Sequence, residues 1–151
     1  MFFLPSKKFS WTLLALFFIF DAFSSYYSVR YMGGKEGNPI IAPYVQKNPV
    51  LFFPIMIFGY ILVYLIYFIL KTGFWIFLRK FKFITNILIE KIVLATIAIF
   101  YFFLVVLNNS LFLLGFRKPE LLKINLIIGL MTAVIYGILI LYVFSNKKVS
   151  T

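Results

Sequence analysis

The chain has 151 residues, of which 64% are hydrophobic and 22% aromatic, with 15 lysine or arginine residues against 4 aspartate or glutamate residues. Soluble domains are nearer half apolar and a quarter charged, so this composition and a mean hydropathy of +1.04 exclude a water-soluble domain, a disordered tail and a free nucleic-acid-binding domain. The absence of cysteine and histidine excludes disulfides, Cys/His zinc sites, His-ligated haem, and serine–histidine or cysteine–histidine catalysis.

Four apolar stretches are each long enough to cross a bilayer as a helix, which takes about 20 residues. Helices are favoured over strands, because the stretches are continuous rather than alternating and backbone groups in lipid need internal partners. The sequence therefore predicts an all-α integral membrane protein, a single domain over residues 1–151 that folds as a four-transmembrane-helix bundle. The predicted spans cover residues 9–29, 50–70, 87–107 with an extension to about 114, and 124–144.

The first span contains a charged residue, Asp21, about 12 residues after its start, or about 18 Å into the membrane at 1.5 Å per residue. A charge at mid-membrane costs about 2.5–3.5 kcal/mol on insertion scales, so the aspartate is expected to have a structural or functional role that offsets this cost. Ser24, Ser25 and Ser28 follow on the same helical face. One face of the first span is therefore polar from mid-membrane to its outer end.

Two Asn-Pro pairs follow the first span, and each places a capping side chain before a proline at the first helical position. Asn38 predicts a short helix over Pro39–Gln46, lying at the outer membrane surface as an interfacial helix. Asn48 predicts that the second span starts at Pro49.

The third span is predicted to run longer than its apolar stretch. Thr85 can cap its start, and Gly115 can end it in a left-handed conformation. Asn108 and Asn109 would then lie inside the outer part of this helix. Pro119 can begin the fourth helix.

The fourth span contains three small residues, each four positions apart: Gly129, Ala133 and Gly137. Such a ladder lets another helix backbone approach closely. The partner can be a helix of the same chain, a second copy of the chain or another subunit.

Lysine and arginine counts near the span ends indicate the orientation of a membrane protein. Eight lie on the side that holds both termini and six on the other, which favours a multi-pass protein of the cell membrane with both termini in the cytoplasm. The loop predicted at Lys71–Phe83 interleaves basic and aromatic residues, a pattern that suits anionic lipid headgroups better than nucleic acid. Its headgroup-binding candidates are Arg79, Lys80 and Lys82.

Two features near the inner surface have ordinary interpretations. Glu90 and Lys91, at the start of the third span, are read as interfacial, with the lysine reaching toward the headgroups. Lys7 and Lys8 precede the first span and would also fit a signal peptide, which is the alternative to a membrane span for this stretch.

The polar residues expected at the outer face form one candidate cluster for a structural network or for a ligand or ion. Its members are Asp21, Ser24, Ser25, Ser28, Glu36, Asn38, Asn108 and Asn109. Asp21 can accept hydrogen bonds from Asn108 or the serines, or pair with Arg30, and so fix helix packing. It can instead bind a cation, a proton or a small polar ligand. No catalytic residue, metal or cofactor is assigned.

The motif DAFS at 21–24, followed by GKEGNP at 34–39, resembles a family of small archaeal and bacterial multi-span membrane proteins of unknown function. The resemblance covers about residues 9–109 and includes an asparagine late in the third span. It implies that one unit is formed by Asp21, Glu36, Asn38, Pro39 and Asn108, with Asn109 fitting nearly as well. The composition, rich in lysine, isoleucine and phenylalanine, would suit a thermophilic archaeon.

The missing catalytic residues, the short loops and the small-residue ladder favour a non-enzymatic accessory or scaffold subunit with a membrane-protein partner or a second copy. The alternative is a small transporter or ion- or ligand-binding protein that uses Asp21 and Glu36, since four spans with one acid in the first are similar to the small multidrug-resistance exporters. A third reading makes the same two acids the acid–base pair of an intramembrane hydrolase or transferase. A dry, fully hydrogen-bonded Asp21 would favour the scaffold, and a wet cavity would favour a site.

Overall fold

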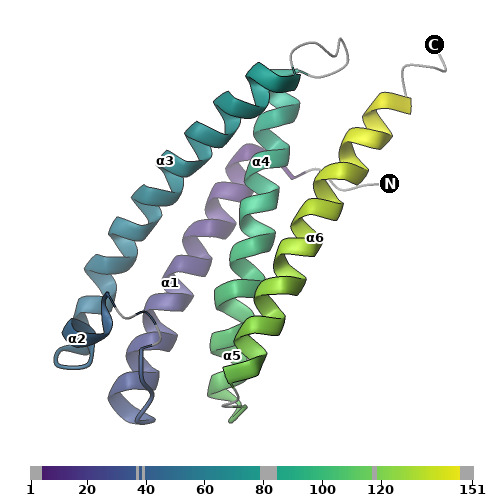
Figure 1. Cartoon of the computed structure of the whole chain (residues 1–151). Helices are drawn as coiled ribbons and strands as arrows, with labels where there is room; N and C mark the ends of the chain where they lie inside the picture. The colour runs from purple at the N-terminus through teal and green to yellow at the C-terminus, as the bar shows by residue number, and fades with distance from the viewer. Residues whose placement is uncertain (1–4, 37, 39, 79–84, 117–118, 147–151) are drawn as a thin grey trace.

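The computed structural model describes residues 5–36, 38, 40–78, 85–116 and 119–146, and every regular element in these ranges is a helix (Figure 1). Four of the helical stretches are long and apolar enough to cross a membrane, which confirms the predicted all-helical class and its four long apolar helices. The elements in chain order are α1 (Lys7–Tyr31), α2 (Ala42–Val45), η1 (Pro49–Leu51), α3 (Phe52–Leu78), α4 (Asn86–Tyr101), η2 (Phe102–Val106), α5 (Leu107–Leu113) and α6 (Pro119–Asn146).

The residues chosen as helix boundaries act as the sequence predicts. Asn48 Oδ1 accepts a hydrogen bond from the Val50 N–H at 3.3 Å, and Thr85 Oγ1 accepts one from the Leu88 N–H at 3.2 Å. Gly115 ends the third long helix with a φ of 93°, a left-handed conformation that suits glycine. Pro119 is the first residue of α6. These ends are local signals, so the sequence is sufficient to place them.

The short helix between α1 and α3 is shorter than the predicted Pro39–Gln46, since α2 covers only Ala42–Val45. Asn38 still acts as a cap: its side chain accepts from the Ile40 N–H at 3.0 Å, and its carbonyl accepts from the Ala42 N–H at 2.9 Å. Pro43 has no N–H, so it cannot make the hydrogen bond four residues back that a helix starting at 39 would need. Pro39 itself lies outside the described residues.

The predicted loop at Lys71–Phe83 is also corrected, because α3 continues through Lys71 to Leu78. The chain therefore stays helical for about two turns beyond the predicted end of the span at residue 70. The headgroup candidates Arg79, Lys80 and Lys82 lie outside the described residues.

The helix α4 lies at the centre of the arrangement and packs against α1, α3 and α6, while α1 also packs against α3 (Figure 1). The starts of α1 and α4 and the ends of α3 and α6 lie at one end of the molecule, which we name the terminal end. The end of α1, the start of α3, α5 and the start of α6 lie at the opposite end. The helices α1 and α4 are therefore parallel.

An aromatic group fastens α1 to α3 near the terminal end. The ring of Trp11 lies edge-on to Tyr60 and to Tyr67, with centroids 5.9 and 5.2 Å apart. The Tyr60 hydroxyl also donates a hydrogen bond to the Trp11 carbonyl at 3.3 Å. Edge-to-face aromatic pairs contribute about 0.5–1.5 kcal/mol beyond their buried area, so this contact sets how the two helices meet.

The small-residue ladder of α6 packs inside the chain, against α4 and η2. Ala133 is 2% exposed, and Gly129 is buried against Phe103. A Cβ atom added at Gly129 would lie 2.7 Å from Phe103 Cβ, whereas one added at Gly137 would meet nothing nearer than Ile92 Cγ2 at 4.0 Å. The close helix approach therefore depends on one glycine of the ladder more than on the other.

This difference predicts opposite effects for the same substitution at two positions. Gly129→Ala should lower the free energy of unfolding by about 1–3 kcal/mol, because Phe103 contacts the new methyl through its own Cβ and cannot swing away. Gly137→Ala should be neutral or should stabilise the helix by about 0.5–1 kcal/mol. Thermal unfolding in detergent, followed by circular dichroism, measures both. Equal effects of the two substitutions would contradict the packing described.

Candidate functional site

The side chain of Asp21 is held between helices by hydrogen bonds to both carboxylate oxygens. Its Oδ2 accepts from the Tyr101 hydroxyl at 2.8 Å, and its Oδ1 accepts from Asn109 Nδ2 at 2.8 Å and from Ser25 Oγ at 3.1 Å. Only 7% of the residue is exposed. The donors come from α1, α4 and α5, so one carboxylate joins α1 to the third long helix.

Ser24 completes this group, which we name the Asp21 cluster: Asp21, Ser24, Ser25, Tyr101 and Asn109. Ser24 Oγ donates to the Asp21 carbonyl at 3.1 Å and accepts from Asn109 Nδ2 at 2.8 Å. Ser24 is 5% exposed. Every member of the cluster therefore has partners within it, and the aspartate is buried.

The two adjacent asparagines have different partners, and of the two that the family resemblance allows, Asn109 is the one that contacts Asp21. Asn108 Nδ2 donates to the Leu104 carbonyl at 2.8 Å, and its Oδ1 accepts from Asn125 Nδ2 at 2.9 Å. Asn125 lies on α6 and is 5% exposed. Asn109 thus connects the third long helix to α1, and Asn108 connects it to α6.

The π-helical segment η2 explains why Asn109 rather than Asn108 reaches Asp21. In a regular α-helix, residue 108 lies seven positions after Tyr101 and shares its face. A π-helical turn accommodates one more residue than an α-helical turn, so the residue eight positions on takes that place. Phe102–Val106 forms this segment between the two positions. Sequence periodicity assumes a regular helix and therefore selects the neighbouring asparagine.

The other members of the predicted cluster belong to the turn after α1. The Ser28 carbonyl accepts from the Gly34 N–H at 3.0 Å, and Glu36 Oε1 accepts from the Asn38 N–H at 2.7 Å. Ser28 lies seven residues beyond Asp21, or about 10 Å along the helix. Arg30, considered as a counter-charge, is exposed in the last turn of α1. Sharing a helical face with Asp21 does not bring Ser28 to the carboxylate, and Glu36 and Asn38 lie in the turn beyond the helix.

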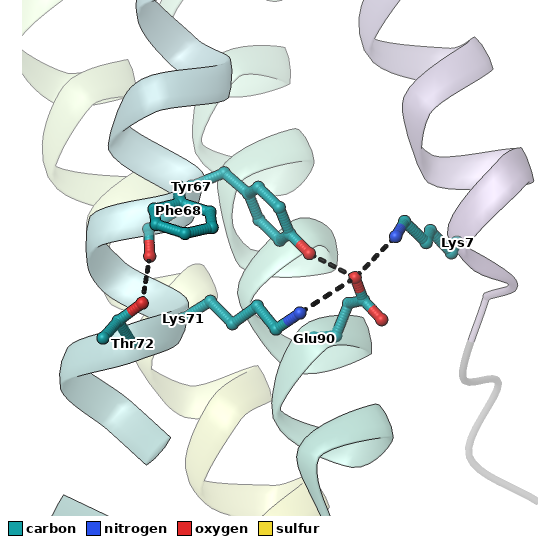
Figure 2. A network of polar contacts seen from close by, with 6 residues as sticks. All are labelled: Lys7, Tyr67, Phe68, Lys71, Thr72 and Glu90. Atoms are coloured by element: carbon teal, nitrogen blue, oxygen red, sulfur yellow. Dashed lines mark hydrogen bonds and ion pairs between the residues drawn. The ribbon is translucent and has the colours of Figure 1, made fainter. Parts of the chain in front are cut away.

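A second polar group joins three helices at the terminal end (Figure 2). Glu90 Oε1 accepts from the Tyr67 hydroxyl and pairs with Lys7 Nζ at 2.7 Å and with Lys71 Nζ at 3.4 Å. The side chains of Glu90 and Lys71 are 14% and 24% exposed, and that of Lys7 is 55% exposed. We name these four residues the Glu90 cluster.

The sequence does not predict the partners of Glu90, whose carboxylate contacts side chains of α1 and α3. One sequence feature does point to these ion pairs. Glu90 is the single acid predicted on the side of the membrane that holds Lys7 and Lys71. Tyr67, Tyr101 and Asn125 were also missed as site residues. The two tyrosines carry no distinguishing signal among ten in the chain, whereas Asn125 stands out as an amide within an apolar span.

The described part of the chain contains no group of three His, Cys, Asp or Glu residues placed to hold a metal ion. Each of the two clusters contains one acid. Their donors are hydroxyl, amide and ammonium groups of the chain itself.

The roles of the two asparagines can be separated by double-mutant cycles. Asp21→Ala combined with Asn109→Ala should show a coupling energy of about 1 kcal/mol, because the two side chains hydrogen-bond directly within the membrane-spanning region. The same aspartate substitution combined with Asn108→Ala should show coupling close to zero. Unfolding in mixed detergent–SDS micelles gives the four free energies of each cycle. A larger coupling for Asn108 would contradict the register set by η2.

No curated protein and no solved structure matches the chain. A family model described as a domain of unknown function (DUF5658) matches residues 12–116. The matched stretch includes all five residues of the Asp21 cluster and ends before α6 begins. This agrees with the resemblance to an uncharacterised family. Because the match covers more than half of its length, the chain belongs to the DUF5658 family, whose function is unknown.

Proposed function

We propose that this protein is a non-enzymatic integral membrane protein that acts as an accessory or scaffold subunit for another membrane protein. The enclosed Asp21 carries the proposal. Its two carboxylate oxygens receive hydrogen bonds from three side chains, and the residue is 7% exposed. A buried polar network in which every member is satisfied makes a bundle rigid and specific. The aspartate is therefore a packing residue.

The outer surface of the bundle supports a role through helix–helix contact. The long helix α3 exposes large apolar side chains along most of its length, among them Ile57, Phe58 and Ile69, which are 66–68% exposed. Such faces contact lipid or another membrane helix. With its polar groups turned inward, the described part of the chain presents apolar faces for a partner and little structure outside the membrane.

The terminal end is placed in the cytoplasm in this proposal. Lys7, Lys8 and Lys71 lie there, and the Glu90 cluster combines two lysines with one glutamate, leaving a net positive charge. Lysine and arginine near span ends favour the cytoplasmic side. Both termini would then be cytoplasmic, with α2 at the opposite membrane surface.

The test is purification of the tagged chain from its native membrane in a mild detergent. The expected result is a partner membrane protein in constant ratio, or a defined oligomer. Recovery as a lone monomer would count against the proposal. The Asp21→Asn variant, which keeps one acceptor oxygen, should retain the same partner. If that variant instead abolished a pH-dependent ligand-binding activity of the wild-type protein, the transporter or ion-binding function would replace the scaffold.

A further inference from the structure

The Glu90 cluster at the terminal end brings more donors to its carboxylate than one oxygen can satisfy. The Tyr67 hydroxyl and the ammonium groups of Lys7 and Lys71 all converge on the single oxygen Oε1 (Figure 2). A carboxylate oxygen offers about two lone pairs as acceptor sites. One of the three donors is therefore poorly satisfied.

The poorly satisfied donor is Lys71. Its Nζ lies 3.4 Å from Glu90 Oε1, beyond the usual range of about 2.7–3.2 Å for a hydrogen bond from nitrogen, whereas Lys7 Nζ lies at 2.7 Å. This long contact is the only one that the Lys71 ammonium makes among the described residues. An ammonium group has three donors, and this side chain is only 24% exposed. The charge is thus mostly removed from water without gaining a close acceptor.

The three charged groups of the cluster carry one net positive charge, and the chain has no second acidic side chain to balance it at this end. Only four residues of the chain are acidic. Besides Glu90 they are Asp21, which has its own cluster, Glu36, which follows α1, and Glu120, the second residue of α6, whose start lies at the opposite end (Figure 1). A second anionic partner for the two lysines is therefore not a carboxylate side chain of this chain.

The depth of Lys71 in the membrane indicates which anions can reach it. The residue lies 19 positions after Phe52, the first residue of α3, or about 29 Å along the helix. The hydrocarbon core of a bilayer is roughly 30 Å thick, so Lys71 lies at the boundary between that core and the headgroup layer. The anions that line this boundary are the phosphate groups of phospholipids.

The spacing of the two ammonium groups suits a single phosphate. Lys7 Nζ and Lys71 Nζ contact the same oxygen, so they can be no farther apart than the sum of their two distances to it, about 6 Å. Two oxygens of one phosphate, each accepting a charge-assisted hydrogen bond at about 2.8 Å, can reach nitrogens at this separation. Two like charges this close also repel each other unless further negative charge lies between or beside them.

We propose that Lys7 and Lys71 bind the phosphate group of an anionic phospholipid at the terminal end, and that Glu90 holds the two lysines at the spacing that one phosphate bridges. A phosphodiester carries one negative charge, which balances the net charge of the cluster. Phosphatidylglycerol, which has no other charge, therefore suits the site better than phosphatidylcholine, whose trimethylammonium group brings a positive charge back. The site depends neither on a protein partner nor on which side of the membrane the termini occupy.

Native mass spectrometry of the full-length protein measures this binding. The protein is reconstituted into vesicles of equal parts phosphatidylglycerol and phosphatidylcholine, extracted into a mild detergent and washed, and the retained lipids are counted. The wild-type protein should retain phosphatidylglycerol in clear preference to phosphatidylcholine. Equal retention of the two lipids would show ordinary contact with the bilayer and would overturn the proposal.

Three variants separate the site from general surface charge and from stability. Lys71→Met should lower phosphatidylglycerol retention about tenfold, the effect of losing one charge-assisted hydrogen bond. Lys91→Met removes a half-buried lysine beside the cluster and should leave retention at the wild-type level. Glu90→Gln removes the carboxylate that competes for the lysines, so it should maintain or raise retention. A fall in Glu90→Gln as large as that in Lys71→Met would show that retention follows folding rather than charge, and would refute the site. If Lys71→Met fails to fold, the lipid preference of the wild-type protein and the Glu90→Gln result decide.

Inorganic phosphate distinguishes a lipid headgroup from a soluble phosphate at the same lysines. Added in excess during the wash, it should leave the phosphatidylglycerol of the wild-type protein in place, because the acyl chains keep the headgroup beside the cluster. Chloride at the same ionic strength is the control for screening. Release of the lipid by phosphate but not by chloride would assign the lysines to a soluble phosphate ester and would contradict the lipid assignment.

Discussion

Asp21→Ala should lower the free energy of unfolding by about 2–4 kcal/mol, a large part of the stability of a small membrane protein. The substitution leaves the Tyr101 hydroxyl, the Asn109 amide and the Ser25 hydroxyl without their shared acceptor. The three lost hydrogen bonds contribute about 0.6 kcal/mol each on average, or about 2 kcal/mol together, and the donors left buried without an acceptor raise the loss toward about 4 kcal/mol. Reversible unfolding in mixed detergent–SDS micelles, followed by circular dichroism, measures the loss.

Two further variants serve as a control and as an intermediate case for Asp21→Ala. Thr12→Val changes an exposed polar residue of the same helix and should alter stability by less than about 0.5 kcal/mol. Asp21→Asn retains one acceptor oxygen but introduces an NH₂ group that faces donors, so its effect should lie between the other two. If Asp21→Ala were as stable as Thr12→Val, the cluster would have no structural role and the proposed scaffold function would lose its main support.

Glu90→Ala should destabilise the protein by about 2 kcal/mol, because it removes the common acceptor of Tyr67, Lys7 and Lys71. Tyr67 is 3% exposed, so its hydroxyl would be left buried without an acceptor. Glu90→Gln keeps an oxygen for the tyrosine and loses only the charge interactions, so the loss should be smaller. Because Lys7 is 55% exposed, the part that depends on charge should shrink further at high salt.

Lys91→Met is the matched control, since this lysine follows Glu90 on α4 but lies outside its cluster. It should leave the unfolding free energy nearly unchanged, whereas Lys71→Met should lower it. Hydrogen exchange of the first turns of α1 provides an independent readout, because Lys7 and Tyr67 hold α1 and α3 to α4. Unchanged exchange and stability in Glu90→Ala would show that the network does not hold the helices together.

The predicted elements agree with the structure where the signal is local. The four apolar stretches, the caps at Asn48 and Thr85 and the end at Gly115 depend on residues close in sequence. The short helix after α1 is shorter than the cap at Asn38 predicts, because Pro43 has no N–H to bond to the carbonyl four residues back. The predicted loop from Lys71 was wrong because the apolar stretch ends before the helix does.

The candidate site was predicted in part. The face formed by Asp21, Ser24 and Ser25 follows from helical periodicity, and the structure places these three residues together. Glu36 and Asn38 were grouped with them by family resemblance and by their expected place at one membrane surface, yet they build a turn beyond the end of α1. A shared surface does not specify contact, since side chains must approach within about 3 Å to form a hydrogen bond.

The sequence by itself determined that the chain forms four long apolar helices and that Asp21 needs polar partners, because hydropathy and helical periodicity are properties of neighbouring residues. Only the tertiary structure decided which partners those are. The π-helical segment at Phe102–Val106 turns Asn109 toward α1 and Asn108 toward α6, and the approach of α1, α3 and α4 brings Lys7 and Lys71 to Glu90. These outcomes depend on the register between helices distant in sequence, which packing sets and local patterns do not encode.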